Sequence, residues 1–316
     1  MRRYLDTYYK SRYLVSEIAI ASGLRDVTEE HWRFCAKKLV ERNERYRSVA
    51  LNVVWILTPT KVTAHRDLLR DYLGSGKFSS WASLLLKALE AQPDYPSIYF
   101  NPASISGLED FFLFDSHWTW DAARKYVEPV LAALGVAQGD LQLIFDNVAH
   151  QGNCNNGPLD AFSKERANYY DSKQYHEIFK SQTKSVPDFS IHHGKNPDGK
   201  LGRGLIIHSS SYAYARGSFR SAFSSITEVF SPYVPESVIR KGSFDHVIIF
   251  FAERNAAVVY DGGPFGERIK QSLNIPYIRE IAQELLDLAC EDGYEIEDIN
   301  FMHALGKAWL GEPHES

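Results

Sequence analysis

The sequence predicts an α+β fold with a central, mostly antiparallel sheet, helices packed around it and a helical N-terminal part. Two observations indicate this class. Helical patterns dominate both ends of the chain, whereas strand patterns gather between residues 141 and 261. Hairpins expected at 189–210 and 246–261 supply the antiparallel strands, and Asn196-Pro197-Asp198-Gly199 is a strong turn signal for the first of them.

The N-terminal part is expected to be mainly helical. Thr28 precedes two acidic residues, a pattern typical of the start of a helix, which here would run to about Arg47. The compact apolar run at 49–57 predicts a buried strand. Further helices are predicted at 62–73 and 80–89.

The remaining elements are predicted from caps, breakers and apolar runs. Helices are expected at 121–134, 158–180, 212–230 and 278–289, and strands at 141–145, 189–193, 205–210, 247–251 and 256–260. Between 93 and 120 the composition shifts to Pro, Asp, Ser and aromatic residues. We expect a single domain spanning 1–316, with a possible seam near 93–120 between the helical N-terminal part and a mixed C-terminal part.

Charge and cysteine usage narrow the functional classes. The formal net charge is −5 and the basic residues are scattered, so no nucleic-acid surface is expected. Cys35, Cys154 and Cys290 are too few for a disulfide framework or a cysteine-based zinc site, which favours a reducing, cytoplasmic location. No apolar run is long enough for a membrane span or signal core, although an export signal without such a core would escape notice. We expect no cofactor, a small-molecule or peptide substrate, and no membrane partner; the oligomeric state stays open.

Three residues occur in the order that a thiol enzyme requires. Cys154 lies a few residues before Pro158, the expected first residue of a helix, where the helix dipole favours a thiolate. His246 and Asp261 could serve as its base and the group that orients that base. Gln151 or a backbone amide could supply the oxyanion donor. The predicted catalytic residues are therefore Cys154, His246, Asp261 and Gln151.

The pairing of His246 with Asp261 depends on a strand register. A hairpin turning at Glu253-Arg254 would place the two side chains directly opposite each other on one face. A slip of one residue would put them on opposite faces, because side chains alternate along a strand. The ordinary alternative is that both residues merely border a buried hairpin.

Two segments resemble papain-like thiol hydrolases and acyltransferases, a superfamily that includes bacterial effector proteases and arylamine N-acetyltransferases. They are the stretch from Gln151 to Phe162, which begins with Gln151-Gly152-Asn153-Cys154, and the stretch from Phe244 to Gly266, which carries Asp261-Gly262-Gly263. In papain a Gln-Gly-x-Cys string is followed three residues later by a second cysteine, which is the nucleophile. Here that position is Gly157, so the role of nucleophile is assigned to Cys154. The resemblance implies a thiol-dependent hydrolase or acyltransferase.

Alternative functions remain open. His65 and Asp67, with His208 or His246, have the residue types of a facial-triad iron site, but residues two apart on a helix do not face the same way. Ser209, Arg216 and Arg220 could hold a phosphate or another anion in a nucleotide-dependent enzyme, although a helix cap also accounts for the serine. A non-enzymatic, aromatic-rich binding protein is the third alternative.

Overall fold

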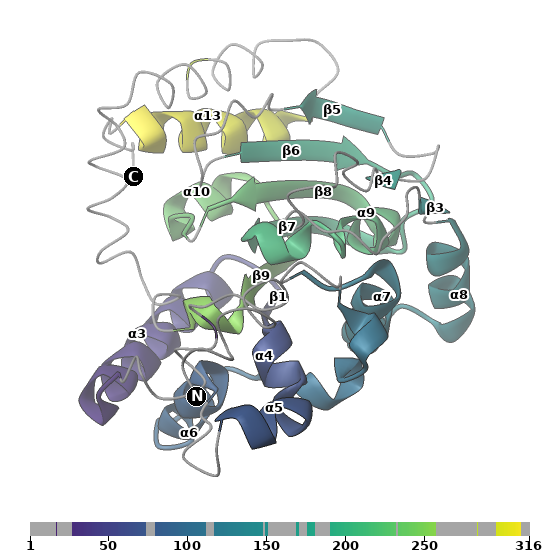
Figure 1. Cartoon of the computed structure of the whole chain (residues 1–316). Coiled ribbons are helices and arrows are strands. Elements are labelled where there is room, and N and C mark those ends of the chain that lie inside the picture. Colours follow the sequence, from purple (N-terminus) through teal and green to yellow (C-terminus); the bar gives the residue numbers. More distant parts are fainter. Residues whose placement is uncertain are drawn as a thin grey trace.

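The computed structural model describes residues 17, 27–73, 80–111, 117–147, 149–150, 169–170, 176–180, 190–231, 233–256, 283 and 295–310. Within these residues, seven strands form one sheet in the order β2-β1-β9-β7-β8-β6-β5 (Figure 1). Its strands are β1 (Asn52–Thr58), β2 (Ile98–Tyr99), β5 (His176–Lys180), β6 (Ser190–Lys195), β7 (Leu201–His208), β8 (Phe223–Phe230) and β9 (His246–Ala252). A second, two-stranded sheet pairs β3 (Ala149–His150) with β4 (Tyr169–Tyr170).

The large sheet is mostly parallel, which corrects the expected antiparallel arrangement. β2, β1, β9, β7 and β8 are parallel neighbours, and β6 runs against both β8 and β5. Strands of a parallel sheet are covered on both faces and read as continuous apolar runs. All seven residues of β9 are buried. Such a run shows that a strand is buried but does not reveal the direction of its neighbours.

Neither expected hairpin forms. β6 and β7 flank the turn at 196–199, but β8 lies between them in the sheet. The turn itself is confirmed, because the Gly199 N–H donates to the Asn196 carbonyl at 2.9 Å. β9 pairs with β1 on one edge and with β7 on the other, so both edges of the strand that begins at His246 are filled. A short 3₁₀ helix, η5 (Glu253–Asn255), follows β9 directly.

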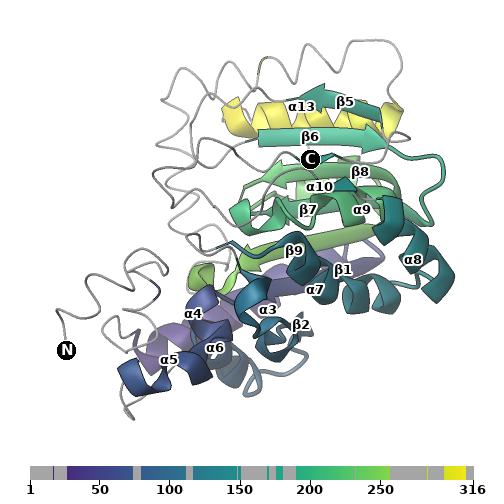
Figure 2. The same cartoon turned by 45° about the vertical axis from the view of Figure 1, so that its right-hand side comes forward.

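Helices cover both faces of the large sheet (Figures 1 and 2). The helices are α3 (Glu29–Arg47), α4 (Lys61–Ala64), α5 (Arg66–Leu73), α6 (Trp81–Leu89), α7 (Trp120–Ala133), α8 (Gln138–Asn147), α9 (Arg216–Ala222), α10 (Glu236–Lys241) and α13 (Ile296–Leu310). One hydrophobic core includes α3, α6, α10 and α13, and the other includes α7, α8 and α9. Along β9 the side chains alternate between the two cores: Val247, Ile249 and Phe251 face the first, and Ile248 and Phe250 face the second. The sheet is therefore the middle layer of three.

Local signals in the sequence predict many of these elements correctly. The Thr28 hydroxyl accepts the His31 N–H at 3.2 Å and caps α3, as expected. Ser80 caps α6 in the same way, and α7 ends next to Gly135, whose φ of 101° is one that glycine adopts without strain. The strand predicted at 49–57 is β1. The helix predicted at 62–73 is divided at His65 into α4 and α5.

Three other predictions of secondary structure are wrong. The apolar run at 141–145 belongs to α8, because a short run of this kind fits a helix as well as a strand. The helix predicted at 212–230 ends at Ala222, and its second half is β8. β4 and β5 occupy the end of the helix predicted at 158–180. The helix predicted at 278–289 lies outside the described residues, apart from Gln283.

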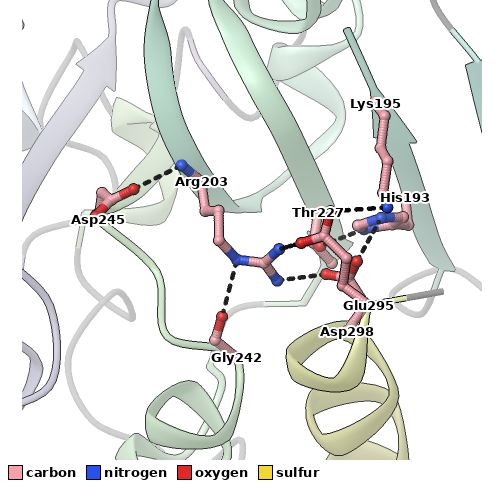
Figure 3. A network of polar contacts seen from close by, with 8 residues as sticks. All are labelled: His193, Lys195, Arg203, Thr227, Gly242, Asp245, Glu295 and Asp298. Atoms are coloured by element: carbon pink, nitrogen blue, oxygen red, sulfur yellow. Dashed lines mark hydrogen bonds and ion pairs between the residues drawn. The ribbon is translucent and has the colours of Figure 1, made fainter. Parts of the chain in front are cut away.

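A polar network fixes the start of α13 to the sheet (Figure 3). Arg203 of β7 donates to Glu295 at 2.8 Å and also to Asp298. The Asp298 carboxylate lies 3.2 Å from His193 Nε2, and Nδ1 of that histidine lies 2.8 Å from the Thr227 hydroxyl. Burial alone would raise the pKa of Asp298, but His193 and Arg203 outweigh burial and lower it. This network lies at the amino end of the parallel strands.

None of the helices in the described ranges combines the length and apolar character needed to cross a bilayer. The single-domain organisation stays a prediction. The stretch at 93–120 contributes β2 to the large sheet, together with the 3₁₀ helices η2 (Pro102–Ile105) and η3 (Leu108–Asp110).

Candidate functional site

The carboxyl ends of three central strands lie together at one edge of the sheet. Thr58 at the end of β1 pairs with Ala252 at the end of β9, and His208 at the end of β7 pairs with Phe250. The loops that leave these strands therefore meet. In open α/β sheets, ligands bind beyond the carboxyl ends of the strands.

A small pocket lies at this edge, with a volume of about 20 Å³. Its lining residues come from four separate parts of the chain: Thr58, Pro59, Thr60, Phe111, His117, Trp118, Ser211, Ala252 and Arg254. A space of this size holds about one water-sized group. The lining combines a hydroxyl, an imidazole and a guanidinium with aromatic walls, which is the composition of a small polar site in an apolar cleft.

Ser211 reaches the pocket from the loop after β7. It lies in the 3₁₀ helix η4 (Ser210–Tyr212), and 7% of the residue's surface is exposed. Its hydroxyl is 3.0 Å from that of Ser209, and its carbonyl accepts a 3.1 Å hydrogen bond from the Trp118 indole. Ser211 is thus tied to the segment that carries His117.

His117 lines the same pocket from the segment that precedes α7. Its neighbour Trp118 forms an isolated β-bridge with Phe111 and packs against Phe250 of β9, with ring centroids 5.9 Å apart. The imidazole lies 5.5 Å from the Tyr214 ring, centroid to centroid. Aromatic packing therefore places this histidine at the pocket.

A buried ion cluster around Glu228 holds the loop that carries Ser211. Tyr212, next to Ser211, donates its hydroxyl to Glu228 at 2.8 Å. Arg220 donates to both oxygens of the same carboxylate, at 2.9 and 2.8 Å, and Arg216 Nε lies 3.2 Å from it. Burial raises the pKa of Glu228, but the two arginines outweigh burial and hold it well below its usual range. The carboxylate stays ionised and anchors both the loop and α9.

Two further carboxylates lie behind the pocket. Glu253 is buried and accepts hydrogen bonds at 2.8 Å from both the N–H and the hydroxyl of Thr60, and a third from Ser80. Burial raises its pKa, against the effect of these hydrogen bonds. Glu17 accepts a hydrogen bond from Arg254 at 2.8 Å. Thr60 and Arg254, which line the pocket, are thus each held by an acidic group.

The predicted thiol triad is only partly within the described residues. Cys154, Gln151 and Asp261 lie outside them, so the proposed roles of these residues stay predictions. His246 begins β9 and pairs with Gly204 and Asn52, at the amino end of the parallel strands. The hairpin expected to place His246 opposite Asp261 does not form, because β1 and β7 pair with the two edges of β9. Burial lowers the pKa of His246, and its ring packs on Phe223. The six-residue rise to Ala252 separates it from the pocket by about 20 Å.

The residues of the predicted anion site lie close together, but the two arginines surround the buried carboxylate of Glu228. Arg216 and Arg220 both contact Glu228, and Ser209 lies beside Ser211. An incoming anion would have to compete with the Glu228 carboxylate for the two arginines. Anion binding at these residues stays a prediction.

The residues of the iron alternative are not gathered into a metal site. His65 is buried, with Nε2 3.0 Å from the Gly107 carbonyl, whereas Asp67 is exposed. His208 Nδ1 lies 3.0 Å from the Ser209 carbonyl, and burial together with Arg216 lowers its pKa to about 3. Over the described ranges, no group of three or more His, Cys, Asp or Glu could hold a metal ion.

Sequence reasoning missed His117 and Arg254 as site residues and assigned Ser211 no catalytic role. The signals were present but weak. Ser209-Ser210-Ser211 follows a predicted strand, and Asp115-Ser116-His117-Trp118 lies in the aromatic segment expected to fold over the core. Nothing in either segment alone indicates that the other is its partner.

No protein-family model and no curated protein matches this sequence. Among solved structures, the chain is similar to PatB1 of Bacillus cereus with a sulfonyl adduct, with a TM-score of 0.56 and 10% identity over 73% of this chain and 90% of that one. A second PatB1 structure gives a TM-score of 0.53 and 12% identity over 73% and 92%. A DHHW family protein from Eubacterium siraeum gives a TM-score of 0.53 and 14% identity over 72% and 85%.

These matches give no support to the papain-like resemblance. They show that the chain shares its fold with PatB1 and with the DHHW family protein.

Proposed function

We propose that this protein is a serine-dependent acyltransferase or esterase in which Ser211 is the nucleophile and His117 is the general base. One observation carries the proposal: these two side chains, distant in the sequence, line one pocket at the carboxyl edge of the sheet. A serine hydroxyl is a weak nucleophile until an adjacent base accepts its proton. The proposal retains the acyl chemistry expected from the sequence and assigns the nucleophile to a serine.

A third residue follows from the local sequence. Asp115 precedes His117 by two positions and lies outside the described residues. Read as residue codes, the name of the DHHW family spells Asp-His-His-Trp, and this chain carries Asp115-Ser116-His117-Trp118. We assign Asp115 the role of orienting the imidazole, as the acid of a triad does. Position 116 departs from the four-letter pattern.

The steps require only these groups and two substrates. The Ser211 oxygen forms a bond to the acyl carbonyl carbon while its proton passes to His117. Collapse of the tetrahedral intermediate breaks the bond to the leaving oxygen, which takes that proton from His117. The hydroxyl of an acceptor, or of water, then gives its proton to His117 and attacks the acyl-serine, which releases the ester or acid and restores Ser211.

The size of the pocket favours a short acyl group. The enclosed space of about 20 Å³ has room for a group of the size of water or methyl. Phe111 and Trp118 supply apolar walls against which such a methyl would pack. We expect activity on phenyl esters to be highest with acetyl and to fall steeply with butyryl and octanoyl groups.

Covalent labelling tests the nucleophile directly. PatB1, which shares the fold, has been solved with a sulfonyl adduct, and sulfonyl fluorides react with activated serine hydroxyls. After incubation with phenylmethanesulfonyl fluoride, intact-mass and peptide mass spectrometry should find one adduct, on Ser211. Ser211→Ala and His117→Ala should both abolish it.

Ser209→Ala and Cys154→Ala are the matched controls. Ser209 carries the neighbouring hydroxyl, 3.0 Å from that of Ser211, and Cys154 carries the thiol of the earlier hypothesis. Both variants should still be labelled on Ser211 and should still hydrolyse 4-nitrophenyl acetate. An adduct at another residue, or esterase activity that survives in Ser211→Ala but is lost in Cys154→Ala, would refute the serine assignment.

A further inference from the structure

Arg254 contributes a cation to the wall of the pocket. It lies in η5, directly after β9, and its side chain is 25% exposed. Its Nη1 donates to Glu17 at 2.8 Å. A guanidinium has five donors, so its hydrogen bond to Glu17, the one it makes within the described residues, leaves it the capacity to bind a second acceptor. The fork geometry of a guanidinium suits a carboxylate.

Glu17 is a buried partner of an unusual kind. Its side chain is 0% exposed, and its second oxygen has no hydrogen-bond partner within the described residues. Burial raises its pKa to about 7, although Arg254 acts in the opposite direction. Near neutral pH the carboxyl is therefore divided between its neutral and ionised forms, and it cancels the charge of Arg254 only in part.

Within the described residues, the charged groups that act on Glu17 include one acid and two cations. Glu253 and Arg254 face it from η5, and Lys61 faces it from α4. Glu253 is engaged by Thr60 and Ser80, and burial raises its pKa as well. Two cations thus lie beside two acids that ionise less readily than usual. The electrostatics of this wall favour an anion.

We propose that Arg254 is a specificity-determining residue that binds a carboxylate on the substrate, and that Glu17 positions its guanidinium. The inference rests on the proposed function, because it concerns the same pocket that Ser211 and His117 line. The substrate class is an ester whose alcohol part, or whose acyl acceptor, bears a carboxylate. A carboxylate bound there receives a charge-assisted hydrogen bond in a site shielded from water.

The arrangement predicts a pH dependence with a definite sign. Below about pH 7 Glu17 is neutral, and the charge of Arg254 is available to the substrate. Above that pH Glu17 is ionised and competes for the guanidinium, so the preference for an anionic substrate falls. His117 is the proposed base for both esters, so its part in the reaction step is common to the two rates.

Two esters that differ by one carboxylate test the proposal. The measured quantity is the ratio of kcat/KM for 4-acetoxybenzoate to that for phenyl acetate, at pH 6, 7 and 8. In the wild type this ratio should exceed that of the uncatalysed reactions and fall as the pH rises. Arg254→Gln should lower the ratio roughly 10- to 100-fold. Arg254→Lys should keep part of the preference. Arg33→Gln, a change of an exposed arginine on α3, should leave the ratio unchanged.

Glu17 variants separate positioning from simple support of the fold. Glu17→Gln keeps an oxygen that can accept from Arg254 but cannot ionise, so the ratio should stay at its pH 6 value up to pH 8. Glu17→Ala should lower the ratio at every pH. A merely structural role would not change the pH profile of a ratio. A profile in Glu17→Gln identical to that of the wild type, or a ratio that Arg254→Gln leaves intact, would overturn the inference.

A binding experiment keeps this inference separate from the proposed function. Calorimetry compares 4-hydroxybenzoate with phenol on the wild type and on Arg254→Gln. Tighter binding of the anion that Arg254→Gln abolishes supports the carboxylate site, even if neither ester is hydrolysed and Ser211 takes no sulfonyl label. Equal binding of the two ligands rejects the site, whatever the esterase activity.

Discussion

The two ends of the parallel strands carry polar groups of opposite character. At the amino end, Arg203, Asp298 and His193 match one another and fix α13 to the sheet (Figure 3). At the carboxyl end, Ser211, His117 and Arg254 line a pocket. Charges that satisfy one another stabilise a fold, whereas polar groups that face a hollow can act on a ligand. The comparison is consistent with the proposed site at the carboxyl edge and with a structural role for the network at the amino edge.

The ion cluster at Glu228 qualifies this contrast. It lies near the carboxyl edge, yet Arg220, Arg216 and Tyr212 leave it fully engaged. Its neighbours along the chain carry the pocket serine. The carboxyl edge thus has a buried, fully paired ion cluster next to the residues of the proposed site, as a preorganised site requires.

The largest expected effect is on the reaction itself. Ser211→Ala at the carboxyl end should lower kcat for 4-nitrophenyl acetate by at least about a thousandfold, because removal of a nucleophile leaves only binding and electrostatic contributions. Its urea-unfolding midpoint should stay near that of the wild type, because the contact that the change removes is a hydrogen bond to the Ser209 hydroxyl. Equal losses of activity and stability would erase the contrast between the two ends.

The next effect is on stability at the amino end. Asp298→Ala leaves Arg203 and His193 without their shared carboxylate, and breaking a buried pair in this way costs about 3–5 kcal/mol. Urea unfolding at pH 7 measures the loss. Ester hydrolysis by the folded fraction should be unchanged. A cost below about 1 kcal/mol would show that the network does not anchor α13.

A smaller effect should appear as a pH dependence of stability. The pKa of Glu17 rises from its ordinary 4.5 to about 7 on folding. The folded state therefore keeps this proton up to a higher pH than the unfolded state does. As a result, the free energy of unfolding falls as the pH rises from about 4.5 to about 7. The shift corresponds to about 3 kcal/mol at most. Glu17→Gln should lack this component when unfolding is followed from pH 5 to pH 8, and parallel curves for the two proteins would contradict the assignment.

The smallest effect should come from the exposed part of the amino-end network. The Glu295 side chain is 52% exposed and contacts Lys195 and Arg203. An ion pair this open to solvent contributes less than about 1 kcal/mol. Glu295→Gln should therefore change the unfolding free energy far less than Asp298→Ala does. A loss as large as that of Asp298→Ala would show that burial does not decide the strength of these pairs.

Sequence patterns predicted elements where the signal is local. The Thr28 and Ser80 caps, the apolar run of β1 and the stop at Gly135 all act within a few residues, and the structure confirms each. Predictions failed where partners are distant. The turn at Asn196 forms as expected, but β8 inserts between the strands on either side of it. No local signal distinguishes that arrangement from a hairpin.

The same limit explains the candidate site. Ser209-Ser210-Ser211 was visible in the sequence as a polar stretch after a strand, and a helix cap accounts for it equally well. The proposed role of Ser211 depends on His117, which is distant from it in the sequence. His117 is placed at the pocket by the packing of Trp118 on β9. The pairing of His246 with Asp261 was predicted from an assumed hairpin. That hairpin is excluded because β9 pairs with the parallel strands β1 and β7 on its two edges.

By itself the sequence determined that this protein has an apolar, aromatic-rich core, helices at its N-terminal part and buried strands in its centre, because composition and short-range periodicity act through local burial. The tertiary structure decided the direction of the strands, the edge at which their ends meet and the residues that share a pocket. Those features depend on pairings between distant segments, and the energy of such a pairing belongs to both partners at once.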